Sequence, residues 1–444
     1  MQSCYSKELL EFIEKSPTCF HVVAALENML REAGFEKLQE SSRWPLRAGG
    51  KYYVTRNGSS IIAFCMPETI DGFHIIACHS DSPTFKVKEL PEIGVGKKYT
   101  KLNVEGYGGM LMSTWFDRPL SVAGRILARE KERIVSRLVN VDRDLLIIPS
   151  LAIHMNRGVN DGYKFNIQKD LLPLYGDGGC AGTFMEVIAE AAGVKAPDIM
   201  GHDLFLYPRV LGSIWGKDDC YISSARLDDL QCVFSSAKGL IMAENCSQAA
   251  MLAVLDNEEV GSTTKQGAAS DFLKETVFRI CCERGMDAVE RSRTVASSFM
   301  VSADNAQAAH PNHMEKADAV NRPFMNEGIV IKYNANQKYT SDAVSSAIFK
   351  MICEKADVPY QVYVNRSDIP GGSTLGNIAG TQISMNTVDI GLAQLAMHSA
   401  YETAGAKDTE YMIKVCRQFF ESIIRCAENG LSLIHISEPT RPEP

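Results

Sequence analysis

The sequence predicts an α/β domain that is interrupted by a β-rich insertion. Helical and strand-like segments alternate before residue 88 and again after Asp228, which is typical of a sheet covered by helices. Residues 88–222 instead contain short alternating runs punctuated by Gly and Asp, which is typical of a β-rich module. At roughly 100–200 residues per domain, a chain of 444 residues fits two or three domains.

The N-terminal part contains two helices, a hairpin and a buried strand. Residues 7–39 have apolar residues at helical spacing, and Ser16-Pro17-Thr18 begins the second helix. Residues 52–65 form two β-rich runs around Asn57-Gly58, a strong signal for a two-residue hairpin turn. Residues 74–78 are a short apolar run, which predicts a buried strand.

Local sequence patterns also predict the strands of the insertion and the helices and strands of the C-terminal part. In the insertion, alternating patterns predict strands over residues 120–128, 133–141 and 145–153. Beyond it, helical periodicity and apolar runs predict three helices and three strands. The helices are 229–243, 342–354 and 412–426, and the strands are 249–255, 330–333 and 361–364.

Composition excludes several classes of protein. The net charge of −8 disfavours a general nucleic-acid binder, because such a protein needs a basic surface. The longest uncharged stretch, residues 369–388, is broken by Pro and Gly, so no membrane span is expected. The 13 cysteines form no C-x-x-C pair and no signal peptide is visible, which predicts reduced thiols and a cytoplasmic location. Residues 431–444 resemble a translated adapter and are treated as a non-native tail, so His435 is given no function.

Histidines and carboxylates follow the apolar strands at several points. His79-Ser80-Asp81 ends one strand, and Asp81 could orient a metal-binding imidazole, although an ordinary surface turn has the same composition. Asp228 and Asp229 stand at a helix start, where an N-cap pair is the more frequent interpretation of adjacent aspartates.

The segment after residues 249–255 is the strongest single signal. Glu258 and Glu259 must point to different sides, so that one can bind a metal while the other acts as a general base. A charged surface turn is an equally frequent origin of such a cluster. Asp304 also follows an apolar stretch, whereas Pro311 between His310 and His313 favours a structural role for that pair.

The last candidates lie near the C-terminus. His398 sits in an apolar run, where a core histidine is more common than a ligand. Residues 371–376 are rich in Gly, and their backbone N–H groups could hold an anion or oxyanion. Two imidazoles and three carboxylates suit two zinc or similar divalent ions bridged by one carboxylate; the five candidates are His79, Asp228, Glu259, Asp304 and His398.

The motifs as a set resemble one family over essentially all of residues 1–429. They are His79-Ser80-Asp81-Ser82-Pro83, Ser224-Ala225-Arg226-Leu227-Asp228-Asp229, Asp256-Asn257-Glu258-Glu259-Val260-Gly261-Ser262, Ser302-Ala303-Asp304, Gly371-Gly372-Ser373-Thr374 and Ala396-Met397-His398-Ser399. With these six motifs in this order, the chain is similar to the aspartyl aminopeptidase-like dinuclear zinc metalloaminopeptidases. The resemblance implies a mixed-sheet zinc-peptidase catalytic domain of the phosphorylase/hydrolase-like type with an inserted β-rich dimerisation domain.

The resemblance also implies a role for each site residue. Asp228 would bridge two metals, with His79 and Asp304 on one metal and Glu259 and His398 on the other. Glu258 would be the general base that takes a proton from the attacking water and passes it to the leaving amine.

Other roles follow from the same resemblance. Asp81 would orient His79. The peptide bond between Asp228 and Asp229 would be cis, and the family often has Asn at position 229.

Substrate recognition and assembly are implied in the same way. Lys332 would meet the acidic side chain of an N-terminal Asp or Glu, a favourable pairing in a desolvated pocket. Tyr339 and Gly372 would help hold the substrate. His154, in the insertion, would reach the active site of a neighbouring subunit in a dodecamer built from dimers.

The sequence therefore predicts a cytoplasmic metal-dependent aminopeptidase with peptide substrates, no nucleic-acid partner and no membrane association. Its catalytic domain would comprise residues 1–87 and 223–430, with residues 88–222 as the inserted dimerisation domain. The metals would be two divalent ions, zinc in the first instance, with cobalt or manganese as alternatives. The alternative functions are the same fold with a neutral or apolar N-terminal preference, a related dinuclear amide hydrolase acting on a non-peptide substrate, and a non-catalytic assembly or cargo-binding protein.

Overall fold

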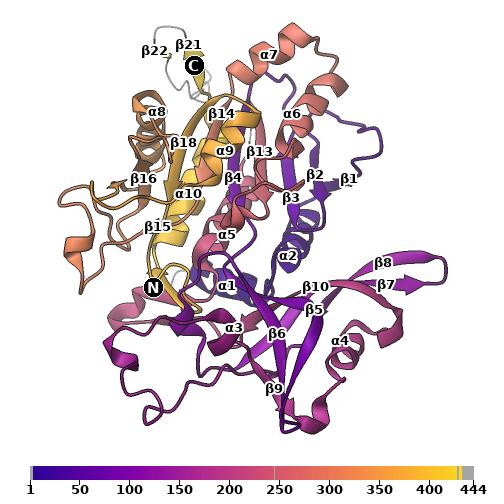
Figure 1. Ribbon diagram of the computed structural model, residues 1–444. Helices are drawn as coiled ribbons and strands as arrows, with labels where there is room; N and C mark the ends of the chain where they lie inside the picture. The colour runs from indigo at the N-terminus through magenta and orange to yellow at the C-terminus, as the bar shows by residue number, and fades with distance from the viewer. Residues whose placement is uncertain (1–3, 245, 428–429, 433–444) are drawn as a thin grey trace, which may run out of the picture.

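A nine-stranded mixed sheet forms the centre of the computed structural model, which describes residues 4–244, 246–427 and 430–432 (Figure 1). Its strand order is β1-β2-β3-β13-β4-β14-β18-β16-β17. In that order the strands are β1 (Glu36–Leu38), β2 (Lys51–Arg56), β3 (Ser60–Cys65), β13 (Ala249–Leu255), β4 (Phe73–His79), β14 (Phe299–Ala303), β18 (Asn386–Gly391), β16 (Ile329–Tyr333) and β17 (Tyr360–Val364).

The four central strands run parallel to one another. β13 pairs with β4, β4 with β14, and β14 with β18, each in parallel. Both faces of these strands are buried, which explains their continuous apolar sequences. Because parallel strands end at the same edge of a sheet, the residues that follow these strands gather at one edge.

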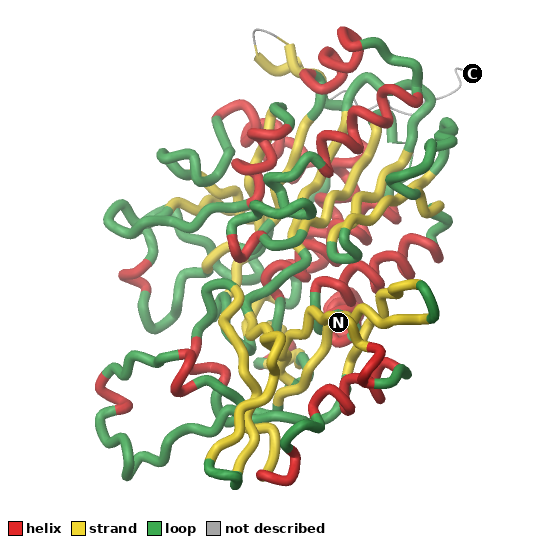
Figure 2. Tube along the Cα trace, turned by 45° about the vertical axis from the view of Figure 1, so that its right-hand side comes forward, coloured by secondary structure: helices red, strands yellow, loops and turns green. Residues whose placement is uncertain are grey.

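Helices cover both faces of this sheet, as the two views in Figures 1 and 2 show. One face packs against α1 (Cys4–Glu14), α2 (Cys19–Glu32), α5 (Leu227–Met242), α8 (Ala343–Lys355) and α10 (Asp408–Glu421). The other face packs against α6 (Phe272–Glu283) and α9 (Leu375–Gln382), and α7 (Ala288–Ala296) follows α6. The sheet is therefore the middle layer of a three-layer arrangement.

A second sheet of six antiparallel strands lies below the first in Figure 1 and has its own apolar core. Its strands, in the order in which they pair, are β8 (Arg133–Asn140), β7 (Leu120–Glu130), β10 (Ile199–Pro208), β5 (Thr84–Val95), β6 (Tyr99–Tyr107) and β9 (Leu174–Asp177). The helices of this region are α3 (Ile167–Asp170) and α4 (Phe184–Ala192).

A third, smaller sheet joins segments from distant parts of the sequence. It consists of β11 (Ser213–Trp215), β12 (Tyr221–Ser224), β20 (Glu402–Gly405), β19 (Ala393–Leu395) and β15 (Ala306–Gln307). Two short strands, β21 (Arg425–Ala427) and β22 (Gly430–Ser432), pair near the C-terminus. The third sheet matters for the site because β19 and β20 flank the turn that carries His398.

The α/β class and most of the expected elements are confirmed, and three expectations were wrong. Residues 36–38, at the end of the range 7–39 that was expected to be helical, form the edge strand β1, which pairs with β2. Residues 145–153 form no strand: Leu146 bridges Leu120, the first residue of β7, Ile147 bridges Leu174 of β9, and the pairing extends no further. The closing helix ends at Glu421 and not at residue 426. The Ser422 hydroxyl donates to the Gln418 carbonyl there, a local hydrogen bond that competes with the helix.

Three further expectations concern the domains, membrane association and the C-terminal tail. All strands of the six-stranded sheet come from residues 84–208. Strands β11 and β12, which begin within the range predicted for the insertion, instead belong to the third sheet, where β12 pairs with β20. The division into domains stays a prediction. Within the described residues, no helix is long and apolar enough to cross a bilayer. Residues 433–444, which include His435, lie outside the described part of the chain.

Candidate metal centre

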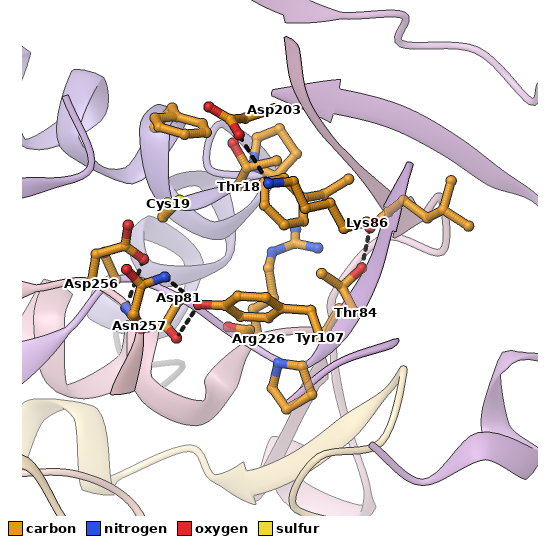
Figure 3. Close-up of a pocket in the computed structure, with 18 of the residues that line it drawn as sticks. Thr18, Cys19, Asp81, Thr84, Lys86, Tyr107, Asp203, Arg226, Asp256 and Asn257 are labelled. Atoms are coloured by element: carbon orange, nitrogen blue, oxygen red, sulfur yellow. Dashed lines mark hydrogen bonds and ion pairs between the residues drawn. The ribbon is translucent and has the colours of Figure 1, made fainter. Parts of the chain in front are cut away.

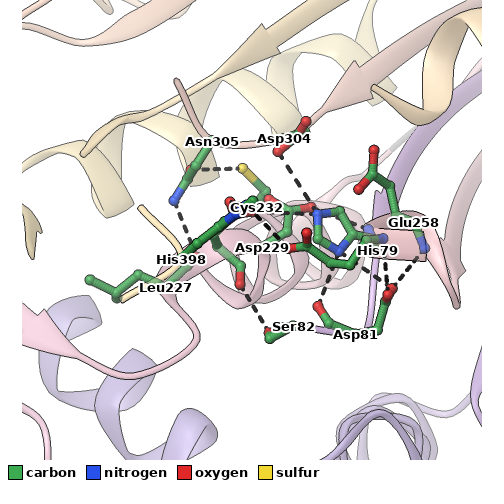
Figure 4. Close-up of polar contacts among 12 residues, drawn as sticks. His79, Asp81, Ser82, Leu227, Asp229, Cys232, Glu258, Asp304, Asn305 and His398 are labelled. Atoms are coloured by element: carbon green, nitrogen blue, oxygen red, sulfur yellow. Dashed lines mark hydrogen bonds and ion pairs between the residues drawn. The ribbon is translucent and has the colours of Figure 1, made fainter. Parts of the chain in front are cut away.

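Five segments of the fold carry the candidate ligands to one place, and Figure 4 shows His79, Asp304 and His398 among them. His79 is the last residue of β4, and Asp304 directly follows β14. Glu259 lies in a single 3₁₀ turn, Glu258–Val260, beyond β13. Asp228 stands at the start of α5, and His398 lies in the turn between β19 and β20. This is the shared edge at which the central parallel strands end.

The Asp228 carboxylate lies between the two imidazoles. Its Oδ1 is 3.4 Å from His79 Nε2, and its Oδ2 is 3.4 Å from His398 Nε2. Each imidazole also has a carboxylate of its own. Asp304 Oδ1 is 3.8 Å from His79 Nε2, and Glu259 Oε1 is 3.4 Å from His398 Nε2. The five side chains thus form two sets of ligands that share Asp228.

These separations fit cation ligands better than hydrogen bonds. A hydrogen bond between nitrogen and oxygen is normally 2.7–3.2 Å long. Two ligands at about 2.05 Å from a tetrahedral zinc ion are separated by roughly 3.3 Å. Three groups have ligand atoms that all lie within 4.8 Å of one another. They are His79, Asp228, Asp229 and Asp304; Asp228, Glu259 and His398; and His79, Glu258 and Glu259, the one group without Asp228. The spacing therefore fits a divalent cation in each set.

The orientation of both imidazoles supports the same interpretation. His79 Nδ1 lies 3.1 Å from the Asp81 carbonyl oxygen, and His398 Nδ1 lies 2.8 Å from the Gly109 carbonyl oxygen. A carbonyl only accepts, so each Nδ1 carries the donated proton. The lone pair of each Nε2 then faces the centre, as in histidines that bind metals.

Two buried carboxylate oxygens without hydrogen-bond donors also fit bound metal ions. Asp228 Oδ1 and Glu259 Oε1 are buried and have no hydrogen-bond donor in the described protein. A buried carboxylate without a partner is strongly destabilising, and a bound cation would remove that penalty. The residues present therefore fit the metals that the sequence predicts.

The titration of the centre reflects this crowding of charge. Burial lowers the pKa of His398, but the neighbouring Asp228 and Glu259 carboxylates and the Gly109 carbonyl together outweigh burial and raise the pKa to about 10. Burial raises the pKa of Glu258 to about 8, and it raises the pKa of Glu259 well above the usual range. In Asp228 the two imidazoles overcome the effect of burial and hold the pKa below its usual value. Metals would compete with the protons that these groups share.

Asp81 supports the centre in two ways. Its carbonyl holds His79, while its carboxylate accepts the backbone N–H groups of Glu258 and Glu259, both at 3.1 Å. The carboxylate is also 3.5 Å from His79 Nδ1. Tyr107, on β6, donates to the same carboxylate at 2.8 Å. Asp81 thus fixes the turn that carries Glu258 and Glu259.

Sequence reasoning missed Tyr107 and Glu402. Glu402 accepts the backbone N–H of His398 at 2.7 Å and that of Asp228 at 3.0 Å, so it fixes two ligands at once. Its place four residues after His398 was the one available signal. The sequence gave no signal for Tyr107, because only the three-dimensional fold brings β6 next to Asp81. The Asp228–Asp229 peptide bond is cis, as the resemblance implied.

Lys332 and Tyr339 lie beside the centre. Lys332 is 2% exposed; its Nζ is 3.3 Å from Asp304 Oδ2, donates to the Asn305 carbonyl at 3.0 Å and lies 5.5 Å from the Tyr339 ring. Gly372 precedes α9 in open surroundings, since a Cβ added there would meet no atom within 4 Å. His154 lies in an exposed loop between β8 and β9 and is not part of the cluster.

Comparisons of sequence give a consistent result. A family model described as aminopeptidase I zinc metalloprotease (M18) matches residues 12–420. The probable M18 family aminopeptidase 2 of Clostridium acetobutylicum is 46% identical over 426 residues, 94% of this chain and 98% of that protein. The probable M18 family aminopeptidase 2 of Pseudomonas aeruginosa (strain UCBPP-PA14) is 39% identical over 434 residues, 95% and 99% of the two chains.

Solved structures agree with the sequences. A chain of the Ape4 and Nbr1 complex superposes with a TM-score of 0.91 at 35% identity, covering 94% of this chain and 85% of that one. The mApe1 dodecamer of S. cerevisiae matches with a TM-score of 0.82 at 27% identity, covering 94% and 96%. Together with the geometry of the centre, these matches show that the chain belongs to the M18 family of zinc metalloaminopeptidases.

Proposed function

We propose that this metalloaminopeptidase removes N-terminal residues from peptides, with Asp and Glu preferred, and uses two divalent metal ions. The observation that carries the proposal is the position of Asp228, whose two carboxylate oxygens each face one imidazole at 3.4 Å. A single metal would not need a shared carboxylate between two separate histidine and carboxylate pairs.

The five ligands named above would hold the ions. Zinc suits this mixture of imidazole and carboxylate, and cobalt or manganese are the alternatives. Ions bound there supply Lewis acidity toward the scissile carbonyl and lower the pKa of water.

Glu258 acts as the general base in this proposal. It neighbours Glu259 in the turn and lies within 4.8 Å of ligand atoms of His79 and Glu259, but it belongs to neither group that contains Asp228. Asp81 fixes its backbone through the 3.1 Å hydrogen bond to Glu258 N. From this position Glu258 takes a proton from the attacking water and delivers it to the leaving amine.

The acidic preference rests on Lys332. An ammonium group has three N–H donors, and Asp304 and the Asn305 carbonyl account for two. The third would donate to the side-chain carboxylate of an N-terminal Asp or Glu. The competing proposal is that Lys332 only pairs with Asp304 and does not contact the substrate. The enzyme would then prefer a neutral or apolar N-terminal residue. Tyr339, 5.5 Å below Nζ, and Gly372, in open surroundings, would help to hold the substrate.

Assembly into a dodecamer through the insertion is the quaternary part of the proposal. Apolar side chains flank His154 on an exposed loop, and Met155 is 73% exposed. Large exposed apolar side chains that lie together are typical of a surface that meets another subunit. In the assembly His154 would contribute to the neighbour's active site.

A cytoplasmic location is also proposed. All cysteines whose side chains the structure describes are free thiols, as expected in a reducing compartment.

Initial rates on peptides with N-terminal Asp, Glu, Leu or Ala, with added metal and with chelator, test the function. We expect cleavage of the Asp and Glu peptides that the chelator abolishes. Chelator-sensitive cleavage of the Leu peptide alone would retain the metal mechanism and reject the acidic pocket. Absence of cleavage with any metal would reject the enzymatic proposal.

A further inference from the structure

The end of strand β6 holds one side of the turn that carries Glu258. The hydroxyl of Tyr107, the last residue of β6, accepts a hydrogen bond from Asn257 Nδ2 at 2.8 Å and donates to the Asp81 carboxylate at 2.8 Å (Figure 3). Asn257 directly precedes Glu258 in the sequence. One side-chain hydrogen bond thus links the six-stranded sheet to the residue before the proposed base.

The same end of β6 also approaches the residue after Glu258. Gly108 follows Tyr107 and has a φ of +74°, and a Cβ added there would lie 3.1 Å from Glu259 Cβ. A side chain at position 108 would push the turn away, so this close approach requires glycine. The end of β6 therefore contacts the turn on both sides of Glu258.

Asn257 is suited to link the sheet to the turn. Its backbone is left-handed, with φ 64° and ψ 25°, a conformation that Asn adopts more readily than most residues. Its Oδ1 accepts from Thr264 Oγ1 and Gln266 Nε2, both at 2.8 Å. With both acceptor positions of Oδ1 filled, the Nδ2 group is left to donate to Tyr107, whose own proton goes to Asp81. The chain of hydrogen bonds therefore has one consistent direction.

Apolar packing contributes little to the position of this turn. A cavity of about 310 Å³ lies beside it, and Tyr107, Asn257 and Asp81 all line that cavity (Figure 3). On the solvent side, Val260 is 48% exposed. Because a cavity and solvent offer few packing contacts, hydrogen bonds carry most of the constraint on the turn.

The position of the Glu258 carboxylate follows from its backbone. Within the described residues, the hydrogen bonds of Glu258 are those of its main chain: its N–H donates to Asp81 at 3.1 Å, and its carbonyl accepts from Gly261 at 2.9 Å. A general base must lie within hydrogen-bond reach of the proton that it takes. A shift of about 1 Å in such a group can cost on the order of a hundredfold in rate.

We propose that Tyr107 and Asn257 are positioning residues that orient the general base Glu258, so that the six-stranded sheet controls proton transfer. The proposal rests on the proposed role of Glu258 as the base. It requires that loss of the Tyr107 hydroxyl slows the chemical step, while the five ligands and the substrate-binding residues stay in place.

Steady-state kinetics of Tyr107→Phe in the metal-loaded full chain are the first test. The variant keeps the ring, which packs edge-on against Phe205 at 5.7 Å. With the peptide that the wild type cleaves fastest, we expect kcat to fall about 10–100-fold, part of the roughly 10²–10⁴-fold that a general base supplies. KM and metal content should stay at their wild-type values, because the lost interaction acts only on the transition state.

Tyr175→Phe is the matched control. Tyr175 lies on β9 of the same sheet, its hydroxyl is 2.9 Å from Thr183 Oγ1, and its ring packs edge-on against Phe184 at 5.7 Å. The control removes a comparable hydroxyl that does not contact the turn, so kcat should not change.

The Glu258→Gln background separates positioning of the base from a general effect on the fold. If Tyr107 acts through the base, Tyr107→Phe should lower kcat in the wild type but not further in Glu258→Gln. An equal fall in both backgrounds would overturn the proposal.

Hydrogen exchange over residues 256–262 gives a result that does not depend on turnover. Loss of the contact with Asn257 should speed exchange there in Tyr107→Phe and leave it unchanged in Tyr175→Phe. Asn257→Gly keeps the left-handed backbone and removes the amide, so it should reproduce the kinetic and exchange results. It keeps the test decisive if Tyr107→Phe does not fold.

Failure of this proposal differs from failure of the proposed function. A wild-type chain that cleaves no peptide with any metal would reject the function, and with it the base that Tyr107 would orient. In an active wild type, unchanged kcat or unchanged exchange over residues 256–262 in Tyr107→Phe would overturn the positioning role alone.

Discussion

Glu258 and Glu259 are adjacent in sequence but differ in chemistry. Both backbone N–H groups bind Asp81, so one turn fixes both residues. The Glu259 carboxylate points to His398 at 3.4 Å, whereas Glu258 is left outside both ligand sets that share Asp228. The pair can therefore combine a metal ligand with a free general base.

Replacing each glutamate by glutamine should separate these roles. Glu258→Gln keeps every ligand and removes the base, so we expect kcat to fall about 10²–10⁴-fold with metal content unchanged. Glu259→Gln removes a ligand and should lower the metal content. Steady-state rates and metal analysis of both variants check this. Full activity of Glu258→Gln would rule out Glu258 as the base.

Lys332 decides between the two proposals for substrate preference. If its third N–H meets the substrate, Lys332→Met should lower kcat/KM for Asp and Glu peptides by roughly tenfold or more relative to Leu peptides. Rates with matched peptides measure this ratio. Lys338→Met, an exposed lysine on the same segment, is the control and should leave the ratio unchanged. An equal fall in kcat/KM for all peptides would show that Lys332 supports Asp304 and does not bind the substrate side chain.

At this scale the sequence predicted the candidate ligands, whose side chains do meet in the structure, but not the residues that hold them in place. His79, Glu259 and Asp304 follow apolar strands, so their place at a common sheet edge could be foreseen from the pattern. The contacts of Tyr107 and Glu402 could not, because they depend on how β6 and β20 meet the metal loops. Such contacts are set by tertiary packing and leave no periodic signal.

The strand β4 carries a histidine at each end, in two different environments. His79 meets the carboxylates of the centre, whereas His74 is fully buried and stacks on Phe419 at 5.0 Å. Its Nδ1 lies 3.2 Å from the Phe419 carbonyl oxygen, and Nε2 has no partner among the described residues. Burial lowers the pKa of His74 to about 4.

His74 should therefore make the fold sensitive to acid. The unfolded chain binds this proton at its ordinary pKa of about 6.5, so stability is lost as the pH falls from 6.5 toward 4. The full shift corresponds to about 3 kcal/mol. His74→Phe, which keeps an aromatic ring, should lose less Tm between pH 7 and pH 5 than the wild type does. His313→Gln, at an exposed histidine, is the control; a wild-type pH dependence in His74→Phe would contradict the assignment.

Elements with one dominant pattern were predicted well. The hairpin at Asn57-Gly58 and the buried strand β13 were clear, because turn chemistry and apolar runs act locally. Residues 145–153 look like a strand but form two isolated bridges, from Leu146 to Leu120 and from Ile147 to Leu174. Strand pairing is a property of the sheet, so a local pattern cannot predict it.

The six-stranded sheet and the loop after β6 contact the candidate metal centre. Tyr107 reaches Asp81, and the Gly109 carbonyl accepts from His398 Nδ1 at 2.8 Å. The Leu111 N–H in turn donates to the His398 carbonyl at 2.9 Å. Displacement of this sheet would therefore disturb both imidazole–carboxylate sets.

The proposed assembly gives a prediction for the whole molecule. Met155→Asp places a charge on the exposed loop beside His154, so we expect the dodecamer to dissociate and activity to fall. Light scattering after size exclusion measures the mass. Val289→Asp, a comparably exposed position on α7, is the control and should remain assembled. Assembly of Met155→Asp at the wild-type mass would place the interface elsewhere.

Metal content per chain tests the central claim most directly, because the account requires one carboxylate shared by two ions. Elemental analysis of the zinc-loaded wild type should give about two ions per chain, as a two-metal site requires. His398→Ala should retain the ion of the His79 set, and Asp228→Asn should weaken both. One ion per wild-type chain, or two in Asp228→Asn, would contradict the shared role of Asp228.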